Sequence, residues 1–364
     1  MTPVILPYNL AMLIVDGAAI WLLRRQKWLL TQLAILATAG FLAAAIGISL
    51  ALRYEDLFGA ARLCSFGVLL HGPLMLVGAA AVWRRERRWM AAAAMLSALG
   101  LVIAAADAFL IEPHWLDVTH YRIVSAKVRR PVRIVVVADF QADDIGSYER
   151  DVLERVVAEK PNLILFAGDY IQAPWPEYET LQAKLRELLI RLHAACDAPA
   201  FAVEGNIDYD DSDSWRAIFE GTGITAVSRR QSFELPDVDI TCLSLWDSLT
   251  PSLMVSNPRP ERFHIAVGHV PMFARGNVDA DLLVAGHTHA GQVQVPGFGP
   301  VVVNCRIPRR WATGLNDLSG GRKLLVSRGT GMERGYAPPM RFFCRPELAV
   351  IDLAPPDKKE GDRQ

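Results

Sequence analysis

The sequence has no Cys-x-x-Cys pair, and cysteine is scarce, with five in 364 residues. The cysteines therefore give no sign of a paired thiol site for a metal or for redox chemistry. Four of them would suffice for two disulfides in an oxidising compartment, but their spacing does not identify the pairs. These four are Cys196, Cys242, Cys305 and Cys344.

An excess of charge of either sign is also lacking. The chain has 38 lysines and arginines against 39 aspartates and glutamates, so its formal net charge is −1. A protein dedicated to nucleic acid would usually concentrate positive charge in its soluble part. The balance argues against a nucleic-acid polymer as the partner.

The first 111 residues lack the polar face that helices of soluble proteins show. The chain is 52% hydrophobic and its mean hydropathy is +0.21, which is too apolar for a typical soluble protein. A membrane-spanning helix needs about 20 apolar residues. No positive side chain precedes the first apolar run, which argues against a cleaved signal peptide. We expect four transmembrane helices, at 3–23, 28–52, 60–83 and 89–111.

Short-loop charge predicts the orientation of these helices. The loops 24–27 and 84–88 are rich in arginine and lysine, whereas the loop between the second and third helices has Arg53 against Glu55 and Asp56. Because basic loops stay in the cytoplasm, both termini should lie outside it. We therefore expect an integral protein of the bacterial inner (plasma) membrane, with the soluble domain on the non-cytoplasmic face.

A basic run after the fourth helix complicates this orientation. It could lie against anionic lipid headgroups, and long domains translocate largely regardless of such charge. Its residues are Arg122, Lys127, Arg129, Arg130 and Arg133.

Two ionisable residues fall near the middle of the membrane part, Asp16 on the first expected helix and His71 on the third. Such groups are costly in a bilayer and usually face a partner or a cavity. We expect the two side chains to pair. The pair either holds the helices together or forms part of a path for lipid headgroups.

The rest of the chain alternates strand-like and helix-like patterns. We expect a linker at 112–130, an α/β domain at 131–354 and a disordered tail at 355–364. Apolar spacing predicts helices over 147–160, 177–195 and 213–220. The second half of the domain, from about residue 238, has fewer helix signals and more strands.

Five apolar, strand-like runs each end in a residue that could bind a metal. Ligands in open α/β sheets gather beyond the carboxyl ends of strands, so these side chains should converge. Two imidazoles at i and i+2, in Gly286-His287-Thr288-His289, strengthen the indication of a metal site. The residues at the other four strand ends are Asp139, Asp169, Asn206 and His269.

The order Asp, Gly-Asp, Gly-Asn, Gly-His, Gly-His-Thr-His resembles the calcineurin-like metallophosphoesterase superfamily. The resemblance covers about Pro131 to Leu353, and the segments 326–331 and 341–347 look like the closing part of its bacterial transmembrane branch. It implies a two-sheet β sandwich flanked by helices, placed after the four-helix membrane region.

The resemblance also implies two divalent metal ions and a hydroxide that bridges them as the nucleophile. Asp169 would bridge both ions. Asp139, Gln141 and His289 would complete the shell of the first ion, and Asn206, His269 and His287 that of the second.

The sequence departs from the family pattern at two histidines. Gln141 stands in place of the histidine of Asp-x-His, and it offers a neutral amide oxygen or a hydrogen bond to a water. The exchange favours manganese or magnesium over iron or zinc, with manganese first, and can leave one site weakly filled. Ile207 stands where the family commonly has a histidine that protonates the leaving group, so no protein general acid is identified.

These residues predict a membrane-anchored phosphoester hydrolase, either a phosphodiesterase or a pyrophosphatase. Its substrate would be lipid-linked or nucleotide-linked, with membrane lipids as further partners. One alternative is a catalytically degenerate metal-binding or sensory module. Another is a UDP-diacylglucosamine pyrophosphatase of lipid A synthesis, whose substrate is cytoplasmic.

Overall fold

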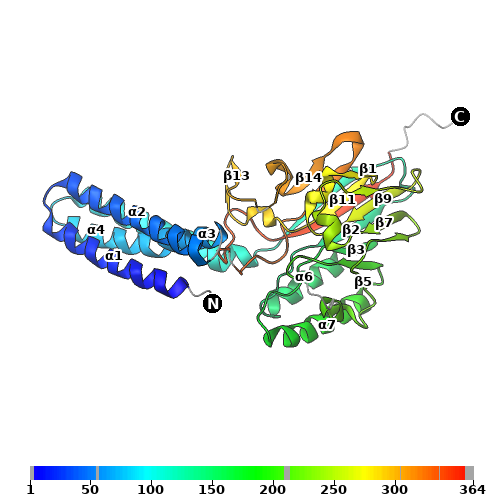
Figure 1. The fold of residues 1–364 in the computed structure, drawn as a ribbon, viewed down its shortest axis with the longest axis horizontal. Helices are drawn as coiled ribbons and strands as arrows, with labels where there is room; N and C mark the ends of the chain where they lie inside the picture. The colour runs from blue at the N-terminus through cyan, green and yellow to red at the C-terminus, as the bar shows by residue number, and fades with distance from the viewer. Residues whose placement is uncertain (1–3, 55–56, 209–213, 304, 336, 357–364) are drawn as a thin grey trace. The chain divides into compact units, whose positions relative to one another are not determined.

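The computed structural model describes residues 4–54, 57–208, 214–303, 305–335 and 337–356. The chain divides into two compact units (Figure 1). The helical unit comprises Met1–Ile111 and Glu333–Met340, and the α/β unit comprises Glu112–Met332 and Arg341–Gln364.

The helical unit contains four helical stretches long and apolar enough to cross a membrane, which confirms the expected four helices. They run over Ile5–Arg25, Leu29–Arg53, Gly59–Trp83 and Arg88–His114. Their elements are α1 (Ile5–Arg25), α2 (Leu29–Tyr54), α3 (Leu57–Phe66), α4 (Gly72–Trp83) and α5 (Arg88–Ala106), with π-helical turns at Gly67–His71 and Asp107–Ile111.

Asp16 on α1 and His71, the last residue of a π-helical turn, form the expected pair. Nδ1 of His71 lies 2.7 Å from Oδ2 of Asp16, and its Nε2 lies 3.0 Å from Oδ1 of Asn9. Both ionisable side chains are buried. A polar group without a partner is costly in an apolar environment, so the pairing lowers the cost of burying both side chains.

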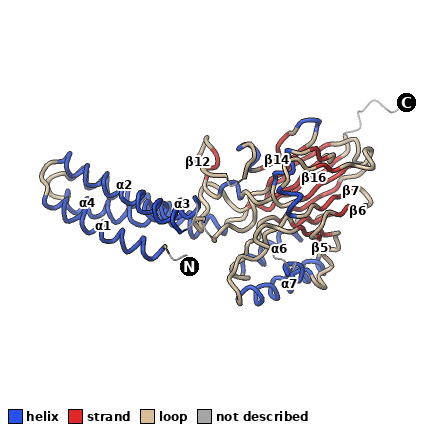
Figure 2. The backbone as a smooth tube through the Cα atoms, in the orientation of Figure 1, coloured by secondary structure: helices blue, strands red, loops and turns tan. Residues whose placement is uncertain are grey.

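The α/β unit contains two six-stranded sheets (Figure 2). The first has the order β1-β16-β2-β3-β4-β5 and the second β14-β15-β11-β9-β7-β6, which confirms the expected two-sheet sandwich. The first sheet comprises β1 (Asp117–Val124), β2 (Val132–Val137), β3 (Leu163–Phe166), β4 (Ala200–Val203), β5 (Thr225–Val227) and β16 (Glu347–Ala354). The second comprises β6 (Gln231–Glu234), β7 (Val238–Cys242), β9 (Phe263–Val267), β11 (Leu282–Ala285), β14 (Gly314–Asp317) and β15 (Lys323–Val326).

The strands are continuously apolar because both faces of the first sheet are covered. On β2, Ile134 and Val136 pack in the core between the sheets, whereas Val135 and Val137 pack toward helices. These helices are α6 (Ser147–Ala158) and α7 (Glu177–Ala195), and each buries one apolar stripe. Alternate residues of one apolar strand therefore pack on opposite faces of the first sheet, one set against the second sheet and the other against the helices.

Shorter elements connect these layers. Two-stranded sheets pair β8 (Met254–Val255) with β10 (Asn277–Val278), and β12 (Gln294–Val295) with β13 (Gly299–Pro300). Short helices are α8 (Leu245–Leu249) and the 3-10 turns Glu112–His114, Ser214–Phe219, Pro271–Arg275, His289–Gly291, Arg309–Ala312 and Ser319–Gly321.

The expected linker, 112–130, includes a strand of the first sheet. β1 pairs in parallel with β16 along its whole length, from Asp117 opposite Glu347 to Val124 opposite Ala354. The helix expected at 213–220 is the 3-10 turn Ser214–Phe219, and its first residue lies outside the described range. Most of the tail, 357–364, also lies outside the described residues. All five cysteines are free thiols.

Candidate metal centre

The structure places all seven candidate ligands at the carboxyl ends of five strands. β2, β3 and β4 run parallel in the first sheet, and β9 and β11 run parallel in the second. Asp139 and Gln141 follow β2, Asp169 follows β3, Asn206 follows β4, His269 follows β9, and His287 and His289 follow β11.

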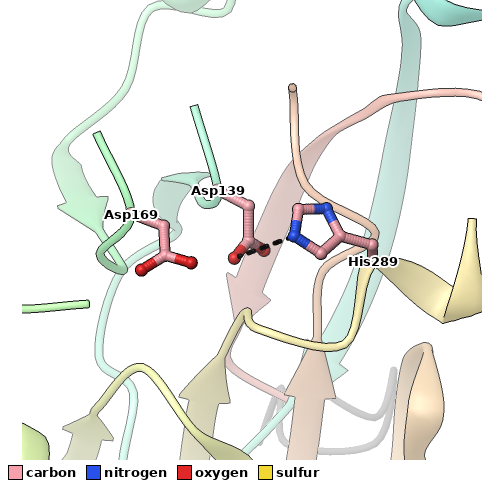
Figure 3. A group of neighbouring side chains, drawn as sticks. All are labelled: Asp139, Asp169 and His289. Carbon is pink, nitrogen blue, oxygen red and sulfur yellow. Dashed lines mark ion pairs between the residues drawn. The ribbon is translucent and has the colours of Figure 1, made fainter. Parts of the chain in front are cut away.

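Asp139, Asp169 and His289 form a buried cluster (Figure 3). One ligand atom from each lies within 4.8 Å of the others, and Nε2 of His289 is 3.8 Å from Oδ1 of Asp139. Nδ1 of His289 is also buried, and within the described part of the chain it has no hydrogen-bond partner. Two buried carboxylates facing an imidazole are a suitable donor set for a divalent cation.

Asn206 lies at the centre of the second group. Its Oδ1 is 2.6 Å from Nδ1 of His287 and 2.9 Å from Nε2 of His269. Nε2 of His269 is in turn 3.3 Å from Oδ1 of Asp169, which connects the two groups. Nδ1 of His269 lies 2.7 Å from the carbonyl of Ala167, and a hydrogen bond from Nδ1–H leaves the lone pair of Nε2 directed at the site.

Gln141 approaches the site through its amide nitrogen. Nε2 of Gln141 donates a hydrogen bond to Oδ2 of Asp169 over 3.1 Å, and the side chain is buried. In this orientation Gln141 acts on Asp169 as a donor. The residue therefore orients the carboxylate that links the two groups.

Five of the seven candidate ligands have a left-handed backbone, which is uncommon for residues other than glycine. Their φ angles are 48° for Asp139, 38° for Gln141, 60° for Asp169, 71° for His287 and 47° for His289. Each such residue costs on the order of 1–3 kcal/mol and persists only where its surroundings hold it. The residues with this strained backbone therefore all lie just after strand ends, among the candidate ligands.

Asp208 holds the loop of Asp169 in place, and sequence reasoning missed it. Its buried carboxylate accepts hydrogen bonds from the backbone N–H groups of Asp169, Gly205 and Tyr170, over 2.7, 2.9 and 2.9 Å. The signal was present in Gly205-Asn206-Ile207-Asp208, because aspartate often caps the backbone of a turn. Asp208 therefore joins the loops that follow β3 and β4.

Gly205 and Gly286 permit this close packing. A Cβ on Gly205 would lie 2.1 Å from the backbone nitrogen of Asp169, and one on Gly286 would lie 2.6 Å from Oδ2 of Asp139. Neither backbone atoms nor a fixed ligand can yield that much space. The glycines before Asn206 and His287 are therefore steric requirements of the site.

Several acidic and basic side chains of the site have strongly shifted pKa values. Burial raises the pKa of Asp139 to about 7, and the charge of Asp169 adds to the rise. Burial acts to raise the pKa of Asp169 as well, but His269 holds it at about 2. The pKa of His269 is about 9, because Asp169 outweighs the lowering effect of burial. Burial and the charge of Arg341 hold the pKa of His289 well below its usual value.

We expect the affinity for Mn²⁺ to rise with pH between about 6 and 9. A cation must displace the proton that Asp139 holds below a pKa of about 7 and the one that His269 holds below about 9. The gain should be at least roughly tenfold from pH 6 to pH 8. Calorimetric titration in buffers of different ionisation enthalpy measures both affinity and proton release. A flat affinity without proton release would contradict the assignment.

The donor set fits divalent metal ions. It combines buried carboxylates, an amide oxygen and imidazole nitrogens, and the buried Nδ1 of His289 has no hydrogen-bond partner among the described residues. These donors follow the ends of five strands that belong to two sheets. Taken together, the fold and the donor set define a candidate site for divalent metal ions at the carboxyl ends of the strands.

Comparison with known proteins supports a site of this kind. Residues 132–291 match the family model "Calcineurin-like phosphoesterase". Over these residues the chain is similar to calcineurin-like phosphoesterases, in agreement with the resemblance of its strand-end motifs.

Curated relatives extend the similarity beyond the matched residues. The metallophosphoesterase YkuE of Bacillus subtilis is 29% identical, over 67% of this chain and 87% of its own length. Phosphodiesterase YaeI of Escherichia coli is 27% identical, over 71% of this chain and 97% of its own length. A "Transmembrane protein with metallophosphoesterase domain" of Bos taurus is 24% identical, over 61% of this chain and 53% of its own length.

Proposed function

We propose that this protein is a membrane-anchored, metal-dependent phosphodiesterase or pyrophosphatase. The observation that carries the proposal is the position of Asp169. Its carboxylate lies between a group formed with Asp139 and His289 and a group formed with Asn206, His269 and His287. A carboxylate placed between two ligand groups is what a pair of adjacent cations requires.

The two groups divide the ligands. Asp139, Asp169 and His289 would hold the first ion, and Asp169, Asn206, His269 and His287 the second. Two bound divalent ions activate a water and neutralise charge on the phosphoryl oxygens. Manganese fits this mixture of carboxylate, amide and imidazole donors best, ahead of magnesium, iron and zinc.

Residues of the chain set how the substrate can react. The backbone N–H of His287 donates to both oxygens of Asp139, over 2.8 and 3.0 Å, and fixes that carboxylate. Ile207 brings no proton donor, and the carboxylate of Asp208 is engaged by three N–H groups. Neither residue supplies a proton to a leaving oxygen. Substrates whose leaving group is already a stable anion, such as anhydrides and activated diesters, therefore suit the site.

The chemistry of the leaving group gives a direct test of residue 207. An imidazole there would act as general acid, so Ile207→His should raise turnover of an alkyl phosphodiester by roughly 10²-fold. Turnover of bis(p-nitrophenyl) phosphate should change little, since p-nitrophenolate leaves without a proton. Ile207→Leu serves as the control of matched size. An equal change for both substrates would show that residue 207 does not supply a missing acid.

The activity itself is tested with the full-length protein in detergent, stripped with a chelator and then titrated with Mn²⁺. We expect turnover of bis(p-nitrophenyl) phosphate or of a nucleoside diphosphate derivative to appear with the metal. The similarity to phosphodiesterase YaeI of Escherichia coli supports this choice of substrate. Failure of every metal to restore turnover across a broad panel of phosphoesters would exclude the enzyme.

A metal-binding or sensory module is the second candidate, since Gln141 and Ile207 replace two expected histidines. Metal stoichiometry separates the two. Two ions per chain favour catalysis, whereas one ion held by Asp169, Asn206, His269 and His287 favours the binding module.

We further propose a lipid-linked or nucleotide-linked substrate, reached from the non-cytoplasmic side of the bacterial inner membrane. The basic loops 24–27 and 84–88 support this orientation, because such loops remain in the cytoplasm. A topology reporter fused after Leu353 tests it. A cytoplasmic reporter would favour UDP-diacylglucosamine instead, since that substrate of lipid A synthesis lies in the cytoplasm.

A further inference from the structure

A small hairpin near the candidate metal centre exposes apolar side chains. β12 and β13 form a sheet of their own, separate from the two six-stranded sheets (Figures 1 and 2). Val295, Phe298 and Val301 are 46%, 63% and 52% exposed. Clustered apolar groups of this kind usually mark an interaction site.

An arginine packs against the apolar residues, and two more lie in the same segment of the chain. The guanidinium of Arg309 lies 3.8 Å from the centre of the Phe298 ring, and it also donates a hydrogen bond to the carbonyl of Pro300. Arg306 and Arg310 are exposed, and among the described residues neither forms an ion pair with a carboxylate. The cluster therefore offers apolar surface and positive charge side by side.

Hydrogen bonds connect the hairpin to the residue that follows the fourth apolar helix. The backbone N–H of Gln294 donates to the carbonyl of Phe342 over 2.9 Å. The next residue, Phe343, is 58% exposed, and its N–H donates to Oε2 of Glu112 over 2.9 Å. Glu112 follows Ile111, where the fourth apolar helical stretch nears its end. The exposed apolar residues thus lie close to the point where the chain leaves its apolar segment.

Trp115 and Arg345 add an aromatic and a cation at the same place. Trp115 is 50% exposed, and the guanidinium of Arg345 lies 3.6 Å from the centre of its ring. Tryptophan beside arginine is typical of the layer between lipid headgroups and acyl chains, where an apolar body and a charged end are both satisfied.

We propose that this surface binds the headgroup layer of a membrane that contains anionic lipid. The membrane-facing surface comprises Trp115, Val295, Phe298, Val301, Phe343, Arg306, Arg309 and Arg310. Arg345 stacks on Trp115 but pairs with Asp117 over 3.4 Å, so its charge is not counted. The apolar side chains enter the interface, and the arginines pair with lipid phosphates. The proposal concerns binding alone and does not depend on phosphoesterase activity.

The basic run at 122–133 does not provide this surface. Three of its cations are already paired with carboxylates of the α/β unit, which neutralises them. Lys127 pairs with Asp281 at 2.8 Å, Arg130 with Asp237 at 2.6 Å and Arg133 with Asp352 at 2.8 Å. Of the five cations in the run, these three are therefore less available to headgroups than Arg306 and Arg310 are.

Photocrosslinking in the full-length protein tests the proposal. p-Benzoylphenylalanine is placed at position 298, or at position 175 as the control, where Trp175 is 68% exposed in the turn before α7. Each protein is irradiated in nanodiscs of phosphatidylcholine with and without phosphatidylglycerol, and adducts are identified by mass spectrometry. Unchanged thermal unfolding verifies that each protein is folded.

We expect phospholipid adducts at position 298 to exceed those at position 175 by at least fivefold. Arg306→Glu combined with Arg310→Glu should lower the yield at position 298 at least threefold in discs that contain phosphatidylglycerol. Equal lipid adducts at the two positions would overturn the proposal. Adducts between two copies of the chain at position 298 would also overturn it, because the surface would then be a protein interface.

Discussion

Replacement of Asp169 by asparagine is expected to lower metal-dependent turnover of a phosphodiester by roughly a thousandfold, about 4 kcal/mol of transition-state stabilisation. The carboxylate of Asp169 accepts hydrogen bonds from Gln141 and from the backbone of Ile207, and it lies 3.3 Å from His269. An amide of the same shape keeps one oxygen but loses the charge that links the two ligand groups. Turnover of bis(p-nitrophenyl) phosphate at saturating Mn²⁺ measures the effect.

The number of metal ions bound per chain distinguishes loss of the bridging carboxylate from loss of the fold. The Asp169→Asn protein should retain about one ion per chain or fewer, measured by mass spectrometry after gel filtration. Asp151→Asn, on the exposed face of α6, is the matched control and should leave both turnover and metal content unchanged. Full turnover in the Asp169→Asn protein would refute the proposed division of the ligands.

Asp208→Ala should produce the largest loss of stability among the residues around the site. The substitution leaves the N–H groups of Asp169, Gly205 and Tyr170 without their acceptor. Each buried, unsatisfied N–H costs about 1–3 kcal/mol, so we expect a loss of roughly 3 kcal/mol or more in the free energy of unfolding. For a unit of this size that lowers Tm by about 6–12 °C.

Calorimetry of the metal-free protein measures this change without a contribution from metal binding. The control is Asp151→Ala, which removes an exposed carboxylate from a helix of the same unit. Asp208→Asn keeps one acceptor oxygen, so it should fall between wild type and Asp208→Ala. A change in Tm no greater than that of the control would show that the hydrogen bonds of Asp208 contribute little.

The sequence predicted those parts of the fold that depend on local patterns. Apolar runs of about 20 residues identify the membrane helices, and helical spacing of leucines identifies α7 to the residue. The runs before Asp139, Asp169 and Asn206 are apolar on both faces, because their strands are buried between two layers. The residues that follow these parallel strands are therefore expected at the same edge of the sheet.

Features that depend on distant partners were not predictable. β1 reads as a linker because an edge strand can keep polar residues such as His120 and Arg122, and its partner β16 lies more than 200 residues away. The turn Gly205-Asn206-Ile207-Asp208 suggests a capping aspartate, but the loop that it caps lies 39 positions earlier, at Asp169, and the sequence does not identify that partner. The hydrogen bond from Gln141 to Asp169 depends on the orientation of an amide, and sequence does not specify that.

The hairpin has a kinetic consequence for any enzyme built this way. Gln294, its first residue, follows His289 by five positions, and Sγ of Cys344 donates to the carbonyl of His289 over 3.3 Å. If the hairpin binds among the headgroups, as proposed, it would keep the neighbouring metal ligands close to the bilayer surface. Substrate would arrive by lateral diffusion in two dimensions, and its mole fraction in the membrane would govern the rate. Adding inert phospholipid would slow the reaction by surface dilution, even at constant total substrate.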